Sequence, residues 1–470
     1  MANLSERLIF IGLDAADMRI VTRLATDGNH PAFARIISGG VSTPICNPPG
    51  LYVGALWPSF FTGSSPAEHG RYCWRQLRPG TYDDEFFQVE QIRGEPVWES
   101  LEKLGRRTAV VDMPKAFLNP SYNGTMIKDW GTHDPSRGGL QTSGWLSRTQ
   151  FTGRYGKDPI GNCDSTPRTP FGFSQFRDDL VARANTRARI FLDILAELHP
   201  EVVFCVFSET HCAGHQCWHF HDAGHALHNS LITAQVGNPL IDVYTALDRA
   251  LTCILNRLSQ NDTVIVLASH GMSSHYNGVD CLPELISVID HGLRGVTHQN
   301  INIPHLLSMD ARPFREKLRI FPVPNNGAFA ALRLNIQGRE PAGMLNSTDA
   351  LALLDHIEPV LNSLYERDTL APIFTSVVRP RALFRGPMES HLPDLLLEWN
   401  REYPIRTIVT PYGEVINSDG DNPRTGDHTA EGMLWTLGNR ASMMQESPIE
   451  VSQLKECILR VVSTFPRSRK

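Results

Sequence analysis

Carboxylate and imidazole side chains stand at the ends of several apolar runs in this sequence. The positions are Asp14, His211 with His215, His270 and, in a later loop, His428. Imidazole and carboxylate are the ligands that zinc, manganese or iron prefer in proteins. One histidine in a large protein is more often structural than functional, but an acid and several histidines at successive strand ends favour a metal site. The spacing of four between His211 and His215 suits two ligands on one helical turn or in a tight loop.

The apolar runs themselves are typical of buried parallel strands. They cover residues 8–13, 108–112, 202–207 and 263–268, and helix-like stretches cover 97–104, 179–198 and 241–258. Strands that alternate with helices indicate an α/β fold, with a central, mostly parallel sheet flanked by helices. Such sheets bind their ligands at the carboxyl ends of the strands, which is where Asp14 and the histidines stand.

Two stretches interrupt this alternation. Residues 131–175 are rich in Gly, Ser, Thr, Pro and Asn, which predicts a long irregular loop, placed over the site. Residues 275–415 carry weaker, mixed patterns with several prolines, and we interpret them as an inserted cap region. The predicted organisation is therefore a catalytic core made of residues 1–274 and 416–470, with the cap between them.

Composition narrows the class of protein. The chain has 470 residues, 41% hydrophobic and 20% charged, as in an ordinary globular protein, and its net charge of −6 argues against a nucleic-acid binder. No apolar run approaches the roughly 20 residues that cross a bilayer, and the N-terminus lacks a signal-peptide layout. With nine scattered cysteines, an odd number, we expect reduced thiols and a cytoplasmic protein without membrane contacts. A homodimer is the default expectation for its assembly.

Several motifs, taken in order, resemble the type I phosphodiesterase and nucleotide pyrophosphatase branch of the alkaline phosphatase superfamily. They are Ile11-Gly12-Leu13-Asp14, Trp57-Pro58-Ser59-Phe60-Phe61-Thr62-Gly63 followed by His69-Gly70, Glu209-Thr210-His211-Cys212-Ala213-Gly214-His215, Ser269-His270-Gly271-Met272 and Thr425-Gly426-Asp427-His428. A stretch from Arg333 to Gly343 also resembles one that is common in bacterial members. The resemblance spans nearly the whole chain and implies an alkaline phosphatase-like fold.

Members of that family usually hold two zinc ions. Carried over position by position, the resemblance implies a first site of His211, His215 and His428. It implies a second site of Asp14, Ser269 and His270. His211 and Ser269 stand where the family usually has Asp, so two carboxylates are missing. We expect a divalent metal, one or two ions, with zinc favoured and manganese or iron also suited to a histidine-rich site.

The nucleophile is a further departure from the resemblance. Family nucleophiles are usually Thr or Ser nine residues before the Thr-Gly pair, and counting back from Thr62 gives Val53, which cannot attack. Tyr52 is adjacent, and a shift of one residue would put its hydroxyl there. Three neutral histidines with an open fourth position are, however, the ligands of a zinc that lowers the pKa of its water to about 7. We therefore favour direct attack by water over a covalent phospho-enzyme.

Other residues near the motifs are expected to border the site. The segment that follows the predicted strand 125–127 contains His133, a candidate for catalysis, and Asp129, a candidate for substrate binding. Trp57 and Trp218 are expected to wall the pocket. For Asp129, His133 and Trp218 the structural alternatives are a loop cap, a surface histidine and core packing.

Together these observations predict a metal-dependent hydrolase of phosphate or phosphonate esters that acts on a small anionic substrate with a phosphodiester or pyrophosphate-like bond. One rival keeps the metal but hydrolyses a sulfate or related ester, or transfers the group to another acceptor. A second rival is an inactive relative that only binds an anion. The absence of the family's nucleophile favours the inactive relative. At His211, however, one type of metal ligand replaces another, which favours an active enzyme.

Overall fold

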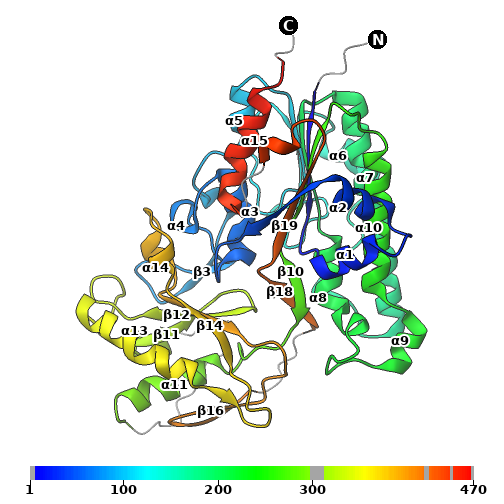
Figure 1. Ribbon diagram of the computed structural model, residues 1–470. Helices are drawn as coiled ribbons and strands as arrows, with labels where there is room; N and C mark the ends of the chain where they lie inside the picture. The colour runs from blue at the N-terminus through cyan, green and yellow to red at the C-terminus, as the bar shows by residue number, and fades with distance from the viewer. Residues whose placement is uncertain (1–5, 297–311, 418–422, 445–447, 467–470) are drawn as a thin grey trace.

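The computed structural model describes residues 6–296, 312–417, 423–444 and 448–466 (Figure 1). A nine-stranded sheet dominates it. Its strands are β1 (Leu8–Leu13), β2 (Val41–Cys46), β5 (Thr108–Val111), β6 (Thr125–Lys128), β7 (Gln141–Ser143), β8 (Val202–Phe207), β9 (Thr263–Ala268), β19 (Gly432–Leu437) and β20 (Ile449–Glu450). Their order is β20-β2-β19-β9-β1-β8-β5-β6-β7. The five strands from β9 to β6 run parallel, whereas β19 and β7 are antiparallel to their neighbours.

Helices cover both faces of this sheet, as Figure 1 shows. One face carries α1 (Met18–Ala25), α2 (Pro31–Gly39), α7 (Pro170–Leu198), α8 (Glu209–His221) and α10 (Pro239–Leu255). The other carries α3 (Tyr52–Thr62), α5 (Val97–Lys103) and α15 (Leu454–Ser463). Strand β1 shows why two layers form, because Ile9 and Ile11 point into one hydrophobic cluster while Leu8 and Phe10 point into the other. The predicted α/β fold, with a central and mostly parallel sheet, is confirmed.

The prediction for residues 131–175 was only partly correct. This stretch contains β7, the helix α6 (Arg148–Tyr155), a short 3-10 turn at Cys163–Ser165 and the beginning of α7. Helix α6 has few apolar residues, and its N-terminus depends on a capping box in which Ser147 accepts from the backbone N–H of Gln150. A short polar helix of this kind has too weak a hydrophobic period to stand out in the sequence.

The predicted cap region has its own sheet and its own hydrophobic cluster. Strands β11 (Ile320–Val323), β12 (Phe329–Leu334), β15 (Leu395–Trp399) and β14 (Phe374–Val378) form a four-stranded sheet. Helices α11 (Leu282–Leu293) and α13 (Ser347–Asn362) pack with it, and so does the small sheet of β13 (Tyr365–Glu366), β16 (Thr407–Thr410) and β17 (Gly413–Ile416). In Figure 1 this part lies beyond one end of the large sheet. The exact boundaries at 275 and 415 stay a prediction.

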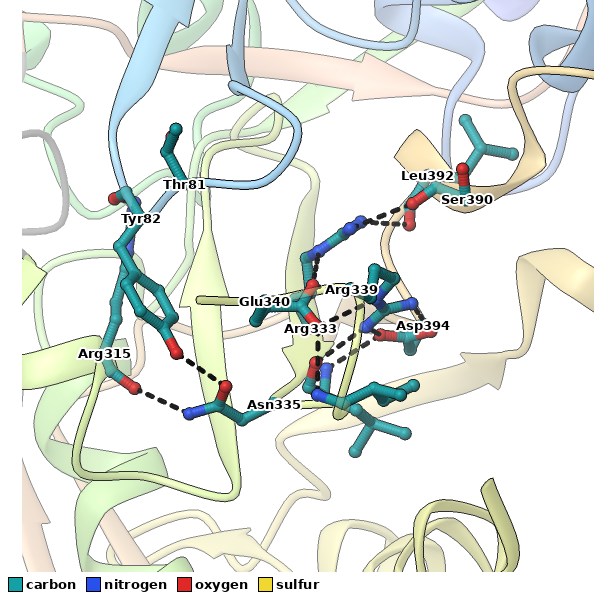
Figure 2. A network of polar contacts seen from close by, with 12 residues as sticks. Thr81, Tyr82, Arg315, Arg333, Asn335, Arg339, Glu340, Ser390, Leu392 and Asp394 are labelled. Atoms are coloured by element: carbon teal, nitrogen blue, oxygen red, sulfur yellow. Dashed lines mark hydrogen bonds and ion pairs between the residues drawn. The ribbon is translucent and has the colours of Figure 1, made fainter. Parts of the chain in front are cut away.

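Residues of the stretch from Arg333 to Gly343 form a buried polar network (Figure 2). Arg333 donates to the carboxylate of Glu340 at 2.7 Å, and Arg339 donates to that of Asp394 at 2.6 Å. The hydroxyl of Tyr82 donates to the Asn335 side chain at 2.7 Å. Tyr82 lies in the hairpin between β3 (Arg75–Leu77) and β4 (Asp84–Phe86), outside the cap. These residues therefore join the cap to the core and lie in a structural network.

Among the described residues, no helix has the length and hydrophobicity needed to cross a membrane. The nine cysteines all lie in the described part of the chain and are free thiols. Residues 1–5, which include most of the N-terminal segment considered above, lie outside the described residues.

His69, at the end of α4 (Pro66–His69), is a buried histidine with two fixed partners. Its Nδ1 accepts from the backbone N–H of Arg71 at 3.1 Å, so its Nε2–H donates to the hydroxyl of Ser59 at 2.9 Å. Burial, together with the charge of Arg71, lowers the pKa of His69 to about 3. Ser59, a buried residue of α3, is thus the hydrogen-bond partner of His69.

This histidine predicts a loss of stability in mild acid. The unfolded chain binds a proton at His69 below pH 6.5, whereas the folded chain does not until about pH 3, so the free energy of unfolding falls as pH falls through this window. At pH 5 the expected loss from His69 is about 2 kcal/mol, at 1.36 kcal/mol per unit. Denaturant unfolding at pH 8 and pH 5 should show a smaller difference for His69→Gln than for the native chain. His356→Gln, on the exposed face of α13, should leave the difference unchanged.

Candidate metal centre

The carboxyl ends of three neighbouring strands bring the predicted site together. In the parallel trio β9-β1-β8, Leu13 lies opposite Phe207 on one side and Ala268 on the other. The residues that follow these strands, Asp14 and Ser269 among them, therefore meet at one edge of the sheet. Helix α8 begins two residues after β8 and carries His211 and His215 into the same place.

A small ribbon outside the sheet adds the remaining histidine. Strands β10 (Gly271–Ser274) and β18 (Gly426–Thr429) pair antiparallel, with Met272 opposite His428. This register places His428 beside His270, which directly precedes β10. In Figure 1 the ribbon and α8 lie between the large sheet and the cap.

Asp14 is the acceptor at the centre of the site. Its Oδ2 accepts from Nδ1–H of His211 at 2.7 Å, and its Oδ1 accepts from the indole N–H of Trp57 at 2.9 Å and the hydroxyl of Ser269 at 3.2 Å. Burial alone would raise the pKa of Asp14, but the neighbouring His211 and His270 and these hydrogen bonds hold it well below its usual range. The carboxylate is therefore ionised and can only accept.

This carboxylate fixes the tautomers of two histidines. Since Nδ1 of His211 must donate to Asp14, its Nε2 carries the lone pair. Since Ser269 donates to Asp14, its Oγ accepts from Nδ1–H of His270 at 2.9 Å, and Nε2 of His270 also carries a lone pair. Burial lowers the pKa of His270 to about 4, so this imidazole is neutral at physiological pH. Both rings thus have the protonation state of a metal ligand.

Three imidazoles converge where these lone pairs point. Each of His211, His270 and His428 offers one ring nitrogen as a ligand atom, and these three atoms lie within 4.8 Å of one another. All three residues are buried. Nε2 of His270 is 3.0 Å from Nδ1 of His428, close to the about 3.3 Å that separates two nitrogens on a tetrahedral zinc. The ligand set therefore fits a divalent transition metal.

His215, which the resemblance placed in the first metal site, also belongs to two groups of possible metal ligands, one with His133 and His211 and one with Asp427 and His428. Its ring is 4.9 Å from that of His211 and 4.6 Å from that of His428. Its Nδ1–H donates to the carbonyl of Gly426 at 2.7 Å, and its Nε2 accepts from Arg424 at 3.4 Å. His215 is also absent from the described residues that line the adjacent cavity, whereas His211, His270 and His428 all line it.

Buried ion pairs hold the start of α8 in place. The carboxylate of Glu209 accepts from Arg183 at 3.1 Å and from Arg187 at 3.1 Å, and Arg187 also pairs with Asp112 at the end of β5. Asp112 in turn accepts from the backbone N–H of Trp130 at 2.8 Å. This network ties α8 to two strand ends and so fixes the first turn that carries His211.

A large cavity opens over the histidines. Its volume is about 1460 Å³, and residues of the sheet edge, of α3, of the loop 133–137 and of the cap line it. Asp14, His211, His270 and His428 form one part of the wall. The cavity is large enough for a substrate of drug-like size or above.

Comparison with known proteins assigns the chain to a family. The model of the type I phosphodiesterase / nucleotide pyrophosphatase family matches residues 8–401. The chain belongs to this family. Membership supports phosphoester hydrolysis, and members generally depend on divalent metal ions. No match was found among curated proteins.

Solved structures agree with this family fold. Phosphonoacetate hydrolase from Sinorhizobium meliloti 1021, in complex with phosphonoacetate, is 14% identical, with a TM-score of 0.59 over 97% of this chain and 96% of that chain. Inactive murine ectonucleotide pyrophosphatase / phosphodiesterase 5, in complex with AMP, is 11% identical, with a TM-score of 0.51 over 99% and 97%. At these identities the likeness shows a shared fold.

Val53, which the resemblance places at the nucleophile position, lies in the first turn of α3 and on the cavity wall. The neighbouring Tyr52 points elsewhere, because its buried hydroxyl donates to the backbone carbonyl of His428 at 2.9 Å. Burial also raises the pKa of Tyr52. This geometry does not support the attacking role predicted for Tyr52, which instead holds the strand that carries His428.

The other predicted site residues lie at different distances from the trio. Trp57 lines the cavity and donates to Asp14, so it contacts the site directly. Asp129 also lines the cavity, but its carboxylate accepts from Lys128 at 2.7 Å and Thr132 at 2.9 Å. His133 stacks on His211 with ring centroids 4.0 Å apart. Trp218 packs against His221 and is absent from the described residues that line the cavity.

Arg71 is a site residue that the sequence did not single out. It lines the cavity, is 3% exposed and donates from Nη1 to the carbonyl of Phe87 at 3.2 Å. Its buried Nε has no hydrogen-bond partner among the described residues. Burial lowers its pKa to about 10, so it stays charged at neutral pH. Its signal was its place directly after the His69-Gly70 motif.

Proposed function

We propose that this chain is a metal-dependent hydrolase of phosphate or phosphonate esters, acting on a phosphodiester or pyrophosphate-like bond. The observation that supports this most strongly is the trio His211, His270 and His428, whose ligand atoms lie within 4.8 Å of one another on the wall of a large cavity. The trio occurs in a chain of the type I phosphodiesterase / nucleotide pyrophosphatase family.

The three imidazoles are proposed to hold one divalent metal, with zinc favoured by the donor set and the near-tetrahedral spacing. When bound, such a metal polarises a phosphoryl oxygen and lowers the pKa of a coordinated water. Asp14 orients His211 directly and His270 through Ser269. In this proposal Asp14 and Ser269 position ligands and are not ligands themselves, and His215 packs against His211 and His428.

Water is the proposed nucleophile, because the cavity wall offers no hydroxyl at the family position. Val53 is an aliphatic side chain, and the Tyr52 hydroxyl is bonded to a backbone carbonyl away from the cavity. In the reaction, the water oxygen forms a bond to phosphorus and gives up one proton, while the ester oxygen leaves with its electron pair and takes up a proton. One displacement of this kind inverts the configuration at phosphorus.

Arg71 is proposed to bind an anionic oxygen of the substrate. A buried guanidinium whose Nε has no hydrogen-bond partner among the described residues has lost its hydration, and a bound anion would restore the missing hydrogen bonds. Its position on the same cavity wall as the histidines puts this contact within the space that a substrate would fill. The likeness to phosphonoacetate hydrolase, a protein solved with a substrate that has two anionic groups, suits this proposal.

Replacing Arg71 with Gln should therefore weaken catalysis without unfolding the protein. A hydrogen bond to a charged group contributes about 1.5–3 kcal/mol, so kcat/KM should fall about 10- to 150-fold, mainly through KM. Steady-state kinetics on a phosphodiester measure this. Arg78→Gln, an exposed arginine of the same hairpin region, is the control and should behave as the native protein. An unchanged kcat/KM in Arg71→Gln would remove Arg71 from the substrate contacts.

The function itself is tested with matched leaving groups. Zinc-loaded protein should hydrolyse bis(4-nitrophenyl) phosphate or 4-nitrophenyl phenylphosphonate faster than 4-nitrophenyl sulfate, and chelation should abolish the activity. With a chiral phosphorothioate diester, inversion supports direct attack by water and retention indicates a covalent intermediate. Faster sulfate hydrolysis would favour the sulfuryl rival. Anion binding without turnover of any ester, with metal bound, would favour the inactive relative.

A further inference from the structure

A second set of metal-ligating atoms lies beside the histidine trio. It consists of Nδ1 of His133, Sγ of Cys163 and Sγ of Cys212, which lie within 4.8 Å of one another and belong to buried residues. His133 comes from the loop after β6, Cys163 from the 3-10 turn Cys163–Ser165 and Cys212 from α8. The three residues are therefore brought together only by the fold.

The distances match those of a bound metal. Nδ1 of His133 is 3.4 Å from Sγ of Cys163 and 3.6 Å from Sγ of Cys212. For zinc bonds of about 2.3 Å to sulfur and about 2.0–2.1 Å to nitrogen, the tetrahedral N···S distance is about 3.5 Å. One ring nitrogen has a single proton or a single lone pair, so it can make a good hydrogen bond with only one of two thiols. A cation between the three atoms would satisfy all of them.

The surroundings of Cys212 suit a thiolate. Arg183, itself 1% exposed, donates from Nη2 to Sγ of Cys212 at 3.2 Å. On the other side of the ring, Nε2 of His133 lies 3.4 Å from the carboxylate of Asp134 and has no hydrogen-bond partner among the described residues. Two thiolates and one divalent cation are together neutral, so such a site adds no net charge to a buried position.

The turn that carries Cys163 is held in place from two sides. The carboxylate of Asp164 pairs with Arg424 at 2.7 Å and accepts from the side chain of Gln216, one turn along α8 from Cys212, at 2.8 Å. These contacts fix Cys163 over α8 without help from a metal. The site is therefore organised in advance, which lowers the cost of binding.

We propose that His133, Cys163 and Cys212 form a second metal site, selective for a thiophilic divalent cation such as zinc, cobalt or cadmium. His133 and Cys163 line the cavity, so the site would be accessible from it. The ring of His133 stacks on that of His211 at 4.0 Å, which makes the two sites neighbours. Metal binding here does not depend on the proposed hydrolase activity.

Cobalt(II) titration of the metal-free, full-length protein, with a non-thiol reductant present, tests this site. Sulfur-to-cobalt charge transfer gives near-ultraviolet absorption that a site of histidines alone cannot give. In the native protein the absorption should saturate after at most two cobalt ions per chain, one for each proposed site. It should persist in His211→Ala and His428→Ala. It should be lost in Cys163→Ser and Cys212→Ser. Cys217→Ala, a buried cysteine of the same helix, is the control and should keep it.

A second measurement keeps the test valid if a cysteine variant does not fold. In the native protein, zinc should protect two thiols from alkylation, and peptide mapping should identify them as Cys163 and Cys212. Absence of charge-transfer absorption in the native protein, or its persistence in both cysteine variants, would overturn the proposal. Equal alkylation of both thiols with and without zinc would do the same. If the native protein showed this absorption but hydrolysed none of the esters, the result would count against the hydrolase proposal alone.

Discussion

His211→Ala is expected to bind one metal fewer than the native protein and to lower kcat/KM by at least about 10³-fold. The substitution removes one of three ligands from the trio and leaves the ionised Asp14 without its closest partner at 2.7 Å. A Lewis-acid metal contributes several kcal/mol to a phosphoryl-transfer barrier, and each 1.36 kcal/mol is a factor of ten. Metal analysis by mass spectrometry, with steady-state kinetics on the same preparation, measures both effects.

A matched histidine on the same helix separates this effect from damage to α8. His221 lies in the last turn of α8 and packs against Trp218, outside the trio. His221→Ala should keep the native metal content and a kcat/KM within about threefold, consistent with a change distant from the reacting groups. If His211→Ala retained every metal and lost less than tenfold in kcat/KM, the trio would not be the catalytic metal site.

The positions at the sheet edge were predictable because the physics that places them is local. Residues 8–13, 202–207 and 263–268 are continuous apolar runs, and each is a strand with those bounds. Parallel strands align their carboxyl ends, so the residues after them must meet. Asp14, His211 and His270 followed from this rule, and the match of the family model over residues 8–401 confirmed the resemblance.

The role of each residue at that edge was less predictable, because it depends on hydrogen bonds between distant segments. The sequence grouped His211 with His215 and His428. Among the described residues, the structure groups His211 with His270 and His428, and it also groups His215 with His133 and His211 and with Asp427 and His428. Only the register of β10 against β18 puts His270 beside His428, and only the contact with Asp14 aims His211 toward them. Neither the strand register nor the contact with Asp14 can be derived from the spacing of residues along the chain.

Two groups were missed for a similar reason. Cys212 stands near Cys205 and Cys217 in the sequence, but its neighbours in the fold are Cys163 and His133, from loops that lie against α8. Arg71 was passed over because its environment decides its role: an arginine on a surface is ordinary, and one that is 3% exposed on a cavity wall is not. The burial of a side chain and its contact partners depend on the tertiary structure, and neither produces a periodic pattern in the sequence.

Asp14→Asn is expected to weaken metal binding by about 10- to 100-fold while leaving the number of metals at saturation unchanged. The amide has nearly the shape of the carboxylate, but only one of its two terminal atoms can accept. Either His211 or the pair Trp57 and Ser269 must then lose its acceptor, and the tautomers of His211 and His270 are no longer fixed. Loss of a partner that orients a ligand has an effect of this size. Competition with a metal indicator measures it.

The same variant decides between two roles for this carboxylate. If Asp14 were itself a ligand of a second metal, as the family resemblance implies, Asp14→Asn would lower the metal content at saturation by one ion. If it orients histidines, the content is kept and only the affinity falls. Asp222→Asn is a suitable control, because this carboxylate accepts from Ser274 and Gly224 and hydrogen-bonds none of the three histidines among the described residues. Suppose that Asp222→Asn binds metal with native affinity, while Asp14→Asn binds the native number of metal ions more weakly. Asp14 would then be a residue that orients the ligands, and the trio would be organised by one buried charge.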